Sequence, residues 1–212
     1  MRDSVRKQTA GEPVVSPFPS TCRREWRAPS DEECFGFWDL HAMPEHIRKH
    51  SQLVADVATA MARRAEELGA TICVQAVRAS ALLHDLAKAY TIAYGGNHSQ
   101  IGAAWALELT GNPQVSHGII HHVHWPFEQD PERHFLPLAV LYGDKRVRHD
   151  SLVSVTERFE DLFKRYGLTE EILGKIRRTM DETLALEQRL NKYLKVDLNA
   201  CAFDRGRLVQ RA

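Results

Sequence analysis

A histidine and an aspartate, His84 and Asp85, stand near the end of an apolar stretch that covers residues 72–88. The spacing of apolar residues in this stretch predicts a buried helix, so both polar side chains are expected in the interior. Burying a carboxylate costs free energy unless a cation or hydrogen bonds replace its hydration. A metal ion supplies that compensation. Because helical neighbours point about 100° apart, the pair is expected to serve two ions, with the carboxylate as the bridge.

The composition is that of one soluble domain. The chain has 212 residues, 43% of them hydrophobic, which is enough for one substantial core. Its 28 lysines and arginines equal its 28 aspartates and glutamates, so a basic surface for duplex DNA is not expected. No apolar run reaches the roughly 18 residues of a membrane span, and the first residues lack a secretory signal core. We therefore expect a cytoplasmic protein that binds neither duplex DNA nor a membrane.

Helical periodicity with start and stop signals predicts an all-α fold. Residues 1–29 are expected to form a flexible N-terminal arm, residues 30–198 a single helical domain and residues 199–212 a C-terminal tail. No strand pattern longer than a few residues is present. The predicted helices cover about residues 30–40, 44–69, 73–89, 98–111, 113–124, 135–148, 153–166 and 169–194. The last of them is expected to cap the bundle or to pair with a second subunit in a homodimer.

Other histidines and acids fall near the predicted interior. His50 lies at the centre of the buried stripe of its helix, where the alternative is a core histidine bonded to the backbone. His98 follows a glycine-rich turn, where it could instead be a surface cap residue. Asp144 borders an apolar run, where it could instead be a cap or an ion-pair partner of Lys145. Each pattern is weak alone, but all of these side chains are consistent with one interior site.

The fifth predicted helix, residues 113–124, carries a group of histidines that periodicity divides into two sets. His122 falls beside the apolar positions and is expected to face inward. His117, His121 and His124 fall on the opposite side and are expected to face solvent or the rim of a cleft. A short helix can be rotated by its loops, so His121 remains an alternative to His122.

Together these positions make a mixed set of imidazole and carboxylate ligands. In chain order they are His50, His84, Asp85, His98, His122 and Asp144. Such a set suits one or two divalent ions of Fe, Mn, Zn, Ni or Co. It is too rich in nitrogen for a dedicated Mg²⁺ or Ca²⁺ site, because both of these ions favour oxygen ligands.

The same residues lie in short motifs that resemble a known family. The motifs are RKHS at residues 48–51, LLHDLAK at 82–88, HSQIGA at 98–103, IIHHV at 119–123 and YGDKRV at 142–147. In this order they resemble the HD superfamily of metal-dependent phosphohydrolases. They look most like its bacterial two-metal members, which include hydrolases of diadenosine tetraphosphate. The resemblance covers residues 44–160 and implies a compact HD-domain helical bundle with ligands from several helices.

The resemblance implies a role for each matching residue. It implies that one metal ion is held by His50, His84, Asp85 and Asp144. It implies a second ion that shares Asp85 and is held also by His98 and His122, with His121 as the alternate. Lys88, one turn after His84, would point into the cleft and contact a phosphate. Asp85 and Lys88 are therefore the expected catalytic residues, and Arg48 and Lys145 are further expected phosphate contacts.

The expected function is hydrolysis of a small phosphate ester or anhydride, with a nucleotide as the expected substrate, through a metal-activated hydroxide. Two other functions remain open. A di-iron oxygenase on the same scaffold would use the same ligands and would form an oxygen-dependent product. A metal-stabilised regulatory module would keep the fold but turn over no phosphorylated compound.

Overall fold

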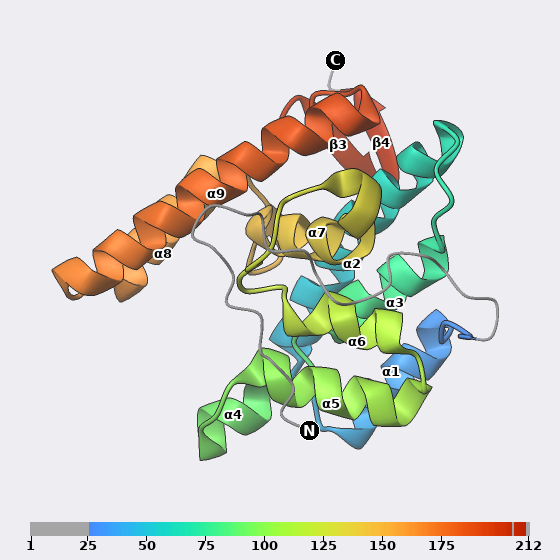
Figure 1. The fold of residues 1–212 in the computed structure, drawn as a ribbon. Helices are drawn as coiled ribbons and strands as arrows, with labels where there is room; N and C mark the ends of the chain where they lie inside the picture. Colours follow the sequence, from blue (N-terminus) through green and yellow to red (C-terminus); the bar gives the residue numbers. More distant parts are fainter. Residues whose placement is uncertain (1–25, 205, 211–212) are drawn as a thin grey trace, which may run out of the picture.

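The computed structural model describes residues 26–204 and 206–210, and helices make up most of this part of the chain (Figure 1). The helices are α1 (Asp31–Leu40), α2 (Glu45–Glu67), α3 (Val74–Leu83), α4 (Lys88–Tyr94), α5 (His98–Thr110), α6 (Pro113–Ile120), α7 (Pro131–Lys145), α8 (Val155–Tyr166) and α9 (Glu170–Leu194). The predicted all-α class is confirmed. Most of the N-terminal arm predicted for residues 1–29 lies outside the described residues.

Two short antiparallel hairpins accompany the helices and were not predicted. Strand β1 (Val147–Arg148) pairs with β2 (Ser151–Leu152) directly after α7. Strand β3 (Cys201–Asp204) pairs with β4 (Arg207–Gln210) and packs on α2, in the segment expected to be a tail (Figure 1). The first pair is too short to show an alternating pattern in the sequence. The second hairpin extends the core cluster, because Phe203 and Leu208 pack against it.

Helix α2 lies at the centre of the fold and packs against α3, α7, α9 and both hairpins. Its buried side chains are mostly small, including Ala55, Ala58, Ala62 and Ala65, all fully inaccessible to solvent. Small side chains let neighbouring helices approach closely, and such close packing fixes their relative positions. Because α2 also carries His50, this packing positions one of the candidate ligands.

Several helix ends coincide with the predicted signals, and others differ. Ser30 and Glu33 form a capping box at the start of α1, and Gly111 ends α5 with a φ of 62°. The segment predicted as one helix over residues 73–89 is divided, since α3 ends at Leu83 and α4 begins after a turn. The helix that begins at Pro113 ends at Ile120 rather than near residue 124.

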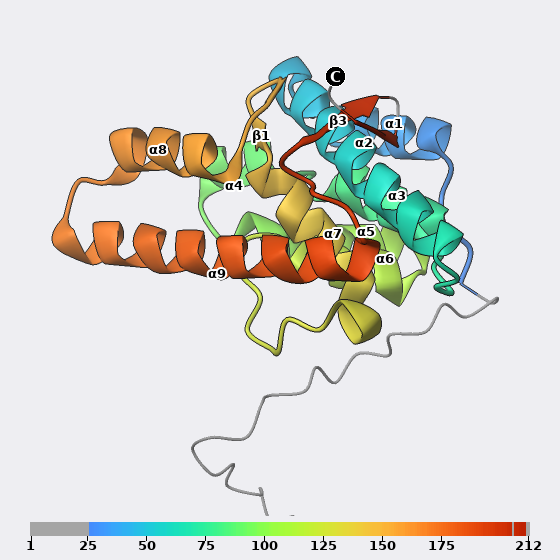
Figure 2. The same ribbon diagram turned by 90° about the horizontal axis from the view of Figure 1, so that it is seen from above.

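Helices α8 and α9 form an antiparallel hairpin that extends away from the other helices (Figures 1 and 2). The end of α9 nearest the core is anchored by the buried side chains of Leu186, Leu190 and Leu194. At the far end Tyr166 and Leu168 are exposed. Among the described helices, none is both long and apolar enough to cross a bilayer.

The packing of α6 predicts a strong effect at Gly118. A methyl group there would lie 2.6 Å from Leu136 Cδ2 and 2.8 Å from the Cβ of Ser80. Gly118→Ala is therefore expected to lower the free energy of unfolding by about 1–3 kcal/mol, because overpacking forces neighbours to shift. Gly36→Ala in α1 is the matched control, since nothing lies within 4 Å of its added methyl group.

The control substitution is expected to raise the free energy of unfolding by about 0.5–1 kcal/mol, as alanine favours a helix over glycine. Urea unfolding followed by circular dichroism measures both changes. Equal effects of the two substitutions would contradict the close packing of α6.

Candidate metal centre

His84 and Asp85 lie in the turn between α3 and α4, at 0% and 1% exposure. The last carbonyls of a helix lack partners within it, and this turn supplies them. Nδ1 of His84 donates to the Ala81 carbonyl over 2.7 Å. The indole nitrogen of Trp38 donates to the Leu82 carbonyl over 2.9 Å. The helix end thereby holds the His84 ring with its Nε2 turned towards the interior.

His122 is oriented by the same local arrangement. It follows the end of α6, and its Nδ1 donates to the Ile119 carbonyl over 2.7 Å. A carbonyl acceptor keeps the imidazole proton on Nδ1, which leaves the Nε2 lone pair for a ligand. The alternate His121 turns elsewhere, with its ring centroid 5.3 Å from that of Trp125 and 5.4 Å from that of Phe127. The structure therefore brings His122 to the centre, and not His121.

Helices α2 and α7 contribute His50 and Asp144. Nδ1 of His50 donates to the carbonyl of His149, in the turn between β1 and β2, over 3.1 Å. Its Nε2 lies 3.1 Å from Asp144 Oδ1. The other carboxylate oxygen of Asp144 accepts from Lys145 Nζ over 2.6 Å. His50 thus has the same division of roles between its two nitrogens as His84 and His122.

The carboxylate of Asp85 faces different histidines with its two oxygens. Oδ2 lies 3.5 Å from Nε2 of His84 and 4.0 Å from Nε2 of His50. Oδ1 lies 3.4 Å from Nε2 of His98 and 3.7 Å from Nε2 of His122. Within each set the ligand atoms lie within 4.8 Å of one another. Two sets that share one carboxylate have the arrangement of a centre for two ions.

Asp144 lies beside the first of these sets. Its Oδ1 is 3.8 Å from Nε2 of His84, in addition to its short distance to His50. It is not part of the mutually close group of His50, His84 and Asp85. All six predicted ligands are therefore brought to one place, with Asp144 at its border.

Buried polar atoms without hydrogen-bond partners indicate whether a metal ion fits between these residues. Nε2 of His84 and Oδ1 of Asp85 are buried, and neither has a hydrogen-bond partner in the described part of the chain. Leaving such a group unpaired costs about 1–3 kcal/mol. The Nε2 atoms of His98 and His122 face each other over 3.1 Å. Ions placed in the two ligand sets would satisfy these nitrogens and oxygens, so the residues fit divalent metal ions.

Burial and charge set the protonation of the centre. Burial acts to raise the pKa of Asp85, but the charges of His84, Lys88 and His122 outweigh it and hold that pKa well below the usual range. Burial lowers the pKa of His122 to about 3, and the charge of His84 adds to this. Burial also lowers the pKa of His98. Burial acts to lower the pKa of His84, but the charges of the neighbouring carboxylates outweigh it and raise that pKa. Near pH 7 the centre therefore offers ionised carboxylates and, at His98 and His122, neutral imidazoles, which are the forms that bind metal. A bound ion would displace the proton of His84.

The expected phosphate contacts have different surroundings. Lys88 begins α4, and its Nζ lies 2.7 Å from Asp85 Oδ2 while its side chain is 39% exposed. Lys145 lines the cleft, but its ammonium is held by Asp144 and by the carbonyl of His122, 3.4 Å away. Lys145 therefore helps to hold two candidate ligands, Asp144 and His122, in position.

Arg48 does not reach the cleft, in contrast to the sequence prediction. Its guanidinium donates to Asp39 over 2.6 Å and to the Met43 carbonyl over 2.7 Å. Its carbon lies 5.9 Å from the ring centre of Trp38. These contacts tie the start of α2 to α1. The phosphate role expected for Arg48 is accordingly not supported.

Two other histidines of the α6 region lie outside the two ligand sets. His124 is exposed, as expected, with Nδ1 3.7 Å from a carboxylate oxygen of Glu182. His117 is buried, so the expectation that it faces outward is wrong. Helix α6 packs against α3, α5 and α7 and has no wholly solvent-facing side at that point.

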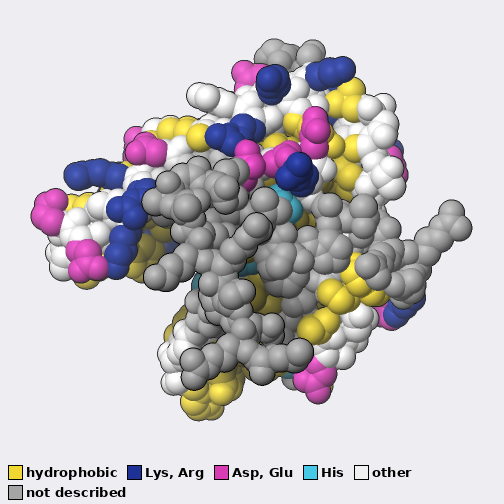
Figure 3. Space-filling view, viewed as in Figure 1, with side chains coloured by type: hydrophobic (Ala, Val, Ile, Leu, Met, Phe, Trp, Pro, Cys, Tyr) yellow, Lys and Arg dark blue, Asp and Glu magenta, His cyan; other side chains and the backbone are white. Residues whose placement is uncertain are grey.

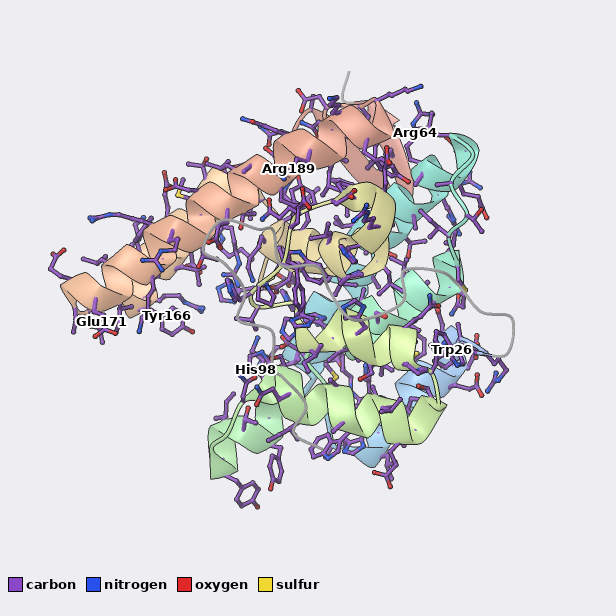
Figure 4. All side chains as sticks on the ribbon, in the orientation of Figure 1. Trp26, Arg64, His98, Tyr166, Glu171 and Arg189 are labelled. Carbon is purple, nitrogen blue, oxygen red and sulfur yellow. The ribbon has the colours of Figure 1, made fainter. Side chains whose placement is uncertain are left out.

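A cleft opens next to Asp85 and has two lobes of about 610 Å³ and about 710 Å³. Both lobes are lined by Asp85, Lys88, Arg158, Leu162 and Tyr166. The hairpin stands out at the left of the molecule in the space-filling view (Figure 3). His98 and Tyr166 are labelled on the two sides of the cleft (Figure 4). The cleft thus has one wall of candidate ligands and one wall formed by the hairpin.

Arg158 of this second wall was not singled out from the sequence. It lies on an amphipathic helix among other charged residues, and the sequence pattern alone does not separate a cleft-facing arginine from a surface one. Only the position of the hairpin beside the centre reveals it.

The fold and the site define an all-α protein with a buried His/Asp centre that fits divalent metal ions. The model of the HD domain family matches residues 47–185, which is more than half of the chain. The chain therefore belongs to the HD domain family, a superfamily of metal-dependent hydrolases. No curated protein and no solved structure with which the chain was compared gives a match. The nearer likeness to two-metal diadenosine tetraphosphate hydrolases stays a prediction.

His121 and His122 are adjacent in the chain, but their positions predict different effects of substitution on the metal content of the protein. His122→Ala is expected to remove the ion shared with Asp85 and His98, because it deletes one of that ion's nitrogen ligands. His121→Ala is expected to keep the native metal content, since its ring packs among aromatic side chains. Elemental analysis by mass spectrometry after desalting measures the metal-to-protein ratio. Loss of metal in His121→Ala with retention in His122→Ala would reverse the assignment.

Proposed function

We propose that this protein is a metal-dependent phosphohydrolase that acts on a small phosphate ester or anhydride, and that the substrate is a nucleotide. The observation that carries the proposal is Asp85, buried on the floor of an open cleft and shared between two sets of histidines. Membership of the HD domain family supports hydrolase chemistry in general. The cleft supports a small substrate, because lobes of about 610 Å³ and about 710 Å³ match the size of ligand pockets.

The centre would hold one or two divalent ions of Fe, Mn, Zn, Ni or Co, a choice that its mixed donors favour. The first ion would be held by His50, His84, Asp85 and Asp144. The second would be held by Asp85, His98 and His122. A bound ion of this kind lowers the pKa of a water molecule and so supplies a nucleophile near neutral pH.

Lys88 orients Asp85 and binds the substrate phosphate. Its ammonium contacts Asp85 Oδ2 and also lines both lobes of the cleft. Burial acts to lower the pKa of Lys88, but the charges of Asp85 and Asp144 outweigh it and raise that pKa. Lys88 is therefore cationic at neutral pH and neutralises negative charge that develops on phosphoryl oxygens.

The residues of the hairpin wall favour a nucleotide over other small phosphate compounds as the substrate. Leu162 and Tyr166 line both lobes and offer apolar and aromatic surface to a base. Lys88 lies in the same lobes, where it would meet the phosphate of the same molecule.

The proposed activity depends on Asp85 and not on the nearby His124. Metal-loaded protein is expected to release phosphate or a nucleotide product from a nucleotide panel with Mn²⁺, Fe²⁺, Ni²⁺ or Zn²⁺. Asp85→Ala is expected to reduce both metal content and turnover to background, because both ligand sets lose their shared member. His124→Ala, exposed and outside both sets, is expected to keep both. Absence of turnover in the metal-loaded native protein, or full turnover in Asp85→Ala, refutes the proposal.

Lys88 provides a second test that separates catalysis from metal binding. Lys88→Ala is expected to lower kcat by about a hundred- to a thousandfold, because a cation at the developing charge is lost. Its metal content is expected to remain close to native. Lys192→Ala, on the exposed side of α9, is the control and keeps native kcat. A native kcat in Lys88→Ala would remove this residue from the catalytic machinery.

A further inference from the structure

Arg158 of α8 reaches the centre of the cleft from the hairpin wall. It is one of the residues shared by both lobes, together with Asp85 and Lys88. Its side chain is only 15% exposed, so the guanidinium lies within the wall and does not extend into solvent. Arg158 and Lys88 line the same two lobes, and the positive charge of Arg158 acts to lower the pKa of Lys88.

The hydrogen-bonding capacity of Arg158 is largely unused. Among the described residues its polar partner is Asp161, with 3.4 Å between Nη1 and Oδ2. Its Nε is buried and has no hydrogen-bond partner in that part of the chain. An arginine presents five N–H donors, and a buried donor without a partner costs free energy. Among the described residues, most donors of this guanidinium therefore have no protein partner.

Arg146, a buried arginine elsewhere in the protein, has the contacts that are typical of a structural role. Arg146 donates from Nε to the Val153 carbonyl over 2.7 Å. Its Nη1 donates to the Tyr142 hydroxyl over 2.6 Å and to the Leu198 carbonyl over 2.9 Å. Arg146 therefore ties several segments together, whereas Arg158 has a single long contact within its own helix.

Other cations of the hairpin line the same space. Lys175 and Arg178 line one lobe, and Arg165 lines the other. The space-filling view shows Lys and Arg side chains along the hairpin, with Asp and Glu side chains among them (Figure 3). Positive charges that converge on a cleft repel one another and attract an anionic ligand. Lys175 is paired with Glu171, and Arg165 with Asp161. The wall therefore complements a phosphate at the Asp85 centre chiefly through Arg158 and Arg178.

We propose that Arg158 is a substrate-binding residue whose guanidinium binds phosphoryl oxygens of the substrate, beside the Lys88 ammonium. The proposal rests on the proposed function and adds to it a contact outside the ligand motifs. A guanidinium presents parallel N–H groups that match two oxygens of a phosphate, which a lysine ammonium does not. Arg158 would thus fix the orientation of the phosphate, whereas Lys88 supplies charge.

Binding of inorganic phosphate to the metal-loaded full chain tests this role without a known substrate. Isothermal titration calorimetry gives the dissociation constant, and elemental analysis gives the metal content of the same samples. Arg158→Ala is expected to weaken phosphate binding by about ten- to a hundredfold, the value of a charged hydrogen bond. Arg158→Lys is expected to recover part of this loss, because lysine keeps the positive charge but lacks the two parallel N–H groups of the guanidinium. Lys164→Ala, exposed on the same helix, is the matched control and binds phosphate as the native protein does.

Asp161→Asn separates substrate binding from a structural ion pair. This variant breaks the contact within α8 but keeps the Arg158 guanidinium. If Arg158 binds phosphate, Asp161→Asn keeps or strengthens phosphate affinity while Arg158→Ala weakens it. If Arg158 acts only through its ion pair, both variants weaken phosphate binding equally, and the proposal is overturned. If Arg158→Ala folds poorly, Arg158→Lys takes its place: a phosphate affinity below the native value in Arg158→Lys, but not in Asp161→Asn, supports the role of the guanidinium, and equal losses overturn it.

Hydrolysis of the nucleotide panel distinguishes failure of the role proposed for Arg158 from failure of the proposed function. Once a substrate is found, Arg158→Ala is expected to raise KM more than it lowers kcat, with native metal content. Native hydrolysis together with unchanged phosphate affinity and KM in Arg158→Ala overturns the role of Arg158 alone. Absence of hydrolysis by the metal-loaded native protein overturns the proposed function itself.

Discussion

The negative charge of Asp85 is held where its side chain is 1% exposed, and the surrounding elements supply what that charge needs. Lys88 contributes an ammonium from the start of α4, and His98 contributes an imidazole from the start of α5. His50 and His122 approach from α2 and from the end of α6. Leaving a buried charge without its partners costs about 3–5 kcal/mol. The positions of these helices therefore determine both how the buried charge of Asp85 is compensated and which groups around it are protonated.

Helix ends, more than helix faces, place the ligands around this charge. His84 and His122 both follow the last turn of a helix and donate Nδ1–H to a carbonyl three residues earlier. Those carbonyls are among the groups that a helix cannot satisfy by itself. This hydrogen bond adds to the backbone bonds at the helix end, keeps the imidazole proton on Nδ1 and turns Nε2 towards Asp85.

This arrangement also explains how adjacent residues reach one centre. On a continuous helix the side chains of His84 and Asp85 would diverge by about 100°. Because α3 ends at Leu83, the following turn redirects Asp85, and its Oδ2 comes to lie 3.5 Å from Nε2 of its neighbour. The sequence-based assumption of one helix through this pair was wrong. The expectation that both side chains are buried is confirmed, because burial follows from the apolar stretch and not from the helix end.

Sequence periodicity predicted burial correctly at His50, on the long helix α2, and at His122, which follows the short helix α6. It failed at His117, because α6 is short and enclosed by several helices. It could not find the β1–β2 turn, whose His149 carbonyl holds His50, because that contact joins segments far apart in the chain. Short-range patterns carry no information about such contacts.

The two walls of the cleft are coupled to the core to different degrees. The ligand wall consists of buried helix ends whose side chains share hydrogen bonds, so a change in one ligand alters the pairing of the others. The hairpin wall packs through α9 against α2 and α7, and through α8 against α7. Arg158 contacts no candidate ligand by a hydrogen bond in the described residues. A change at Arg158 therefore leaves the hydrogen bonds of the candidate ligands intact. In the proposed function, this separation would place the chemistry in the core of the fold and contacts with the substrate in the hairpin.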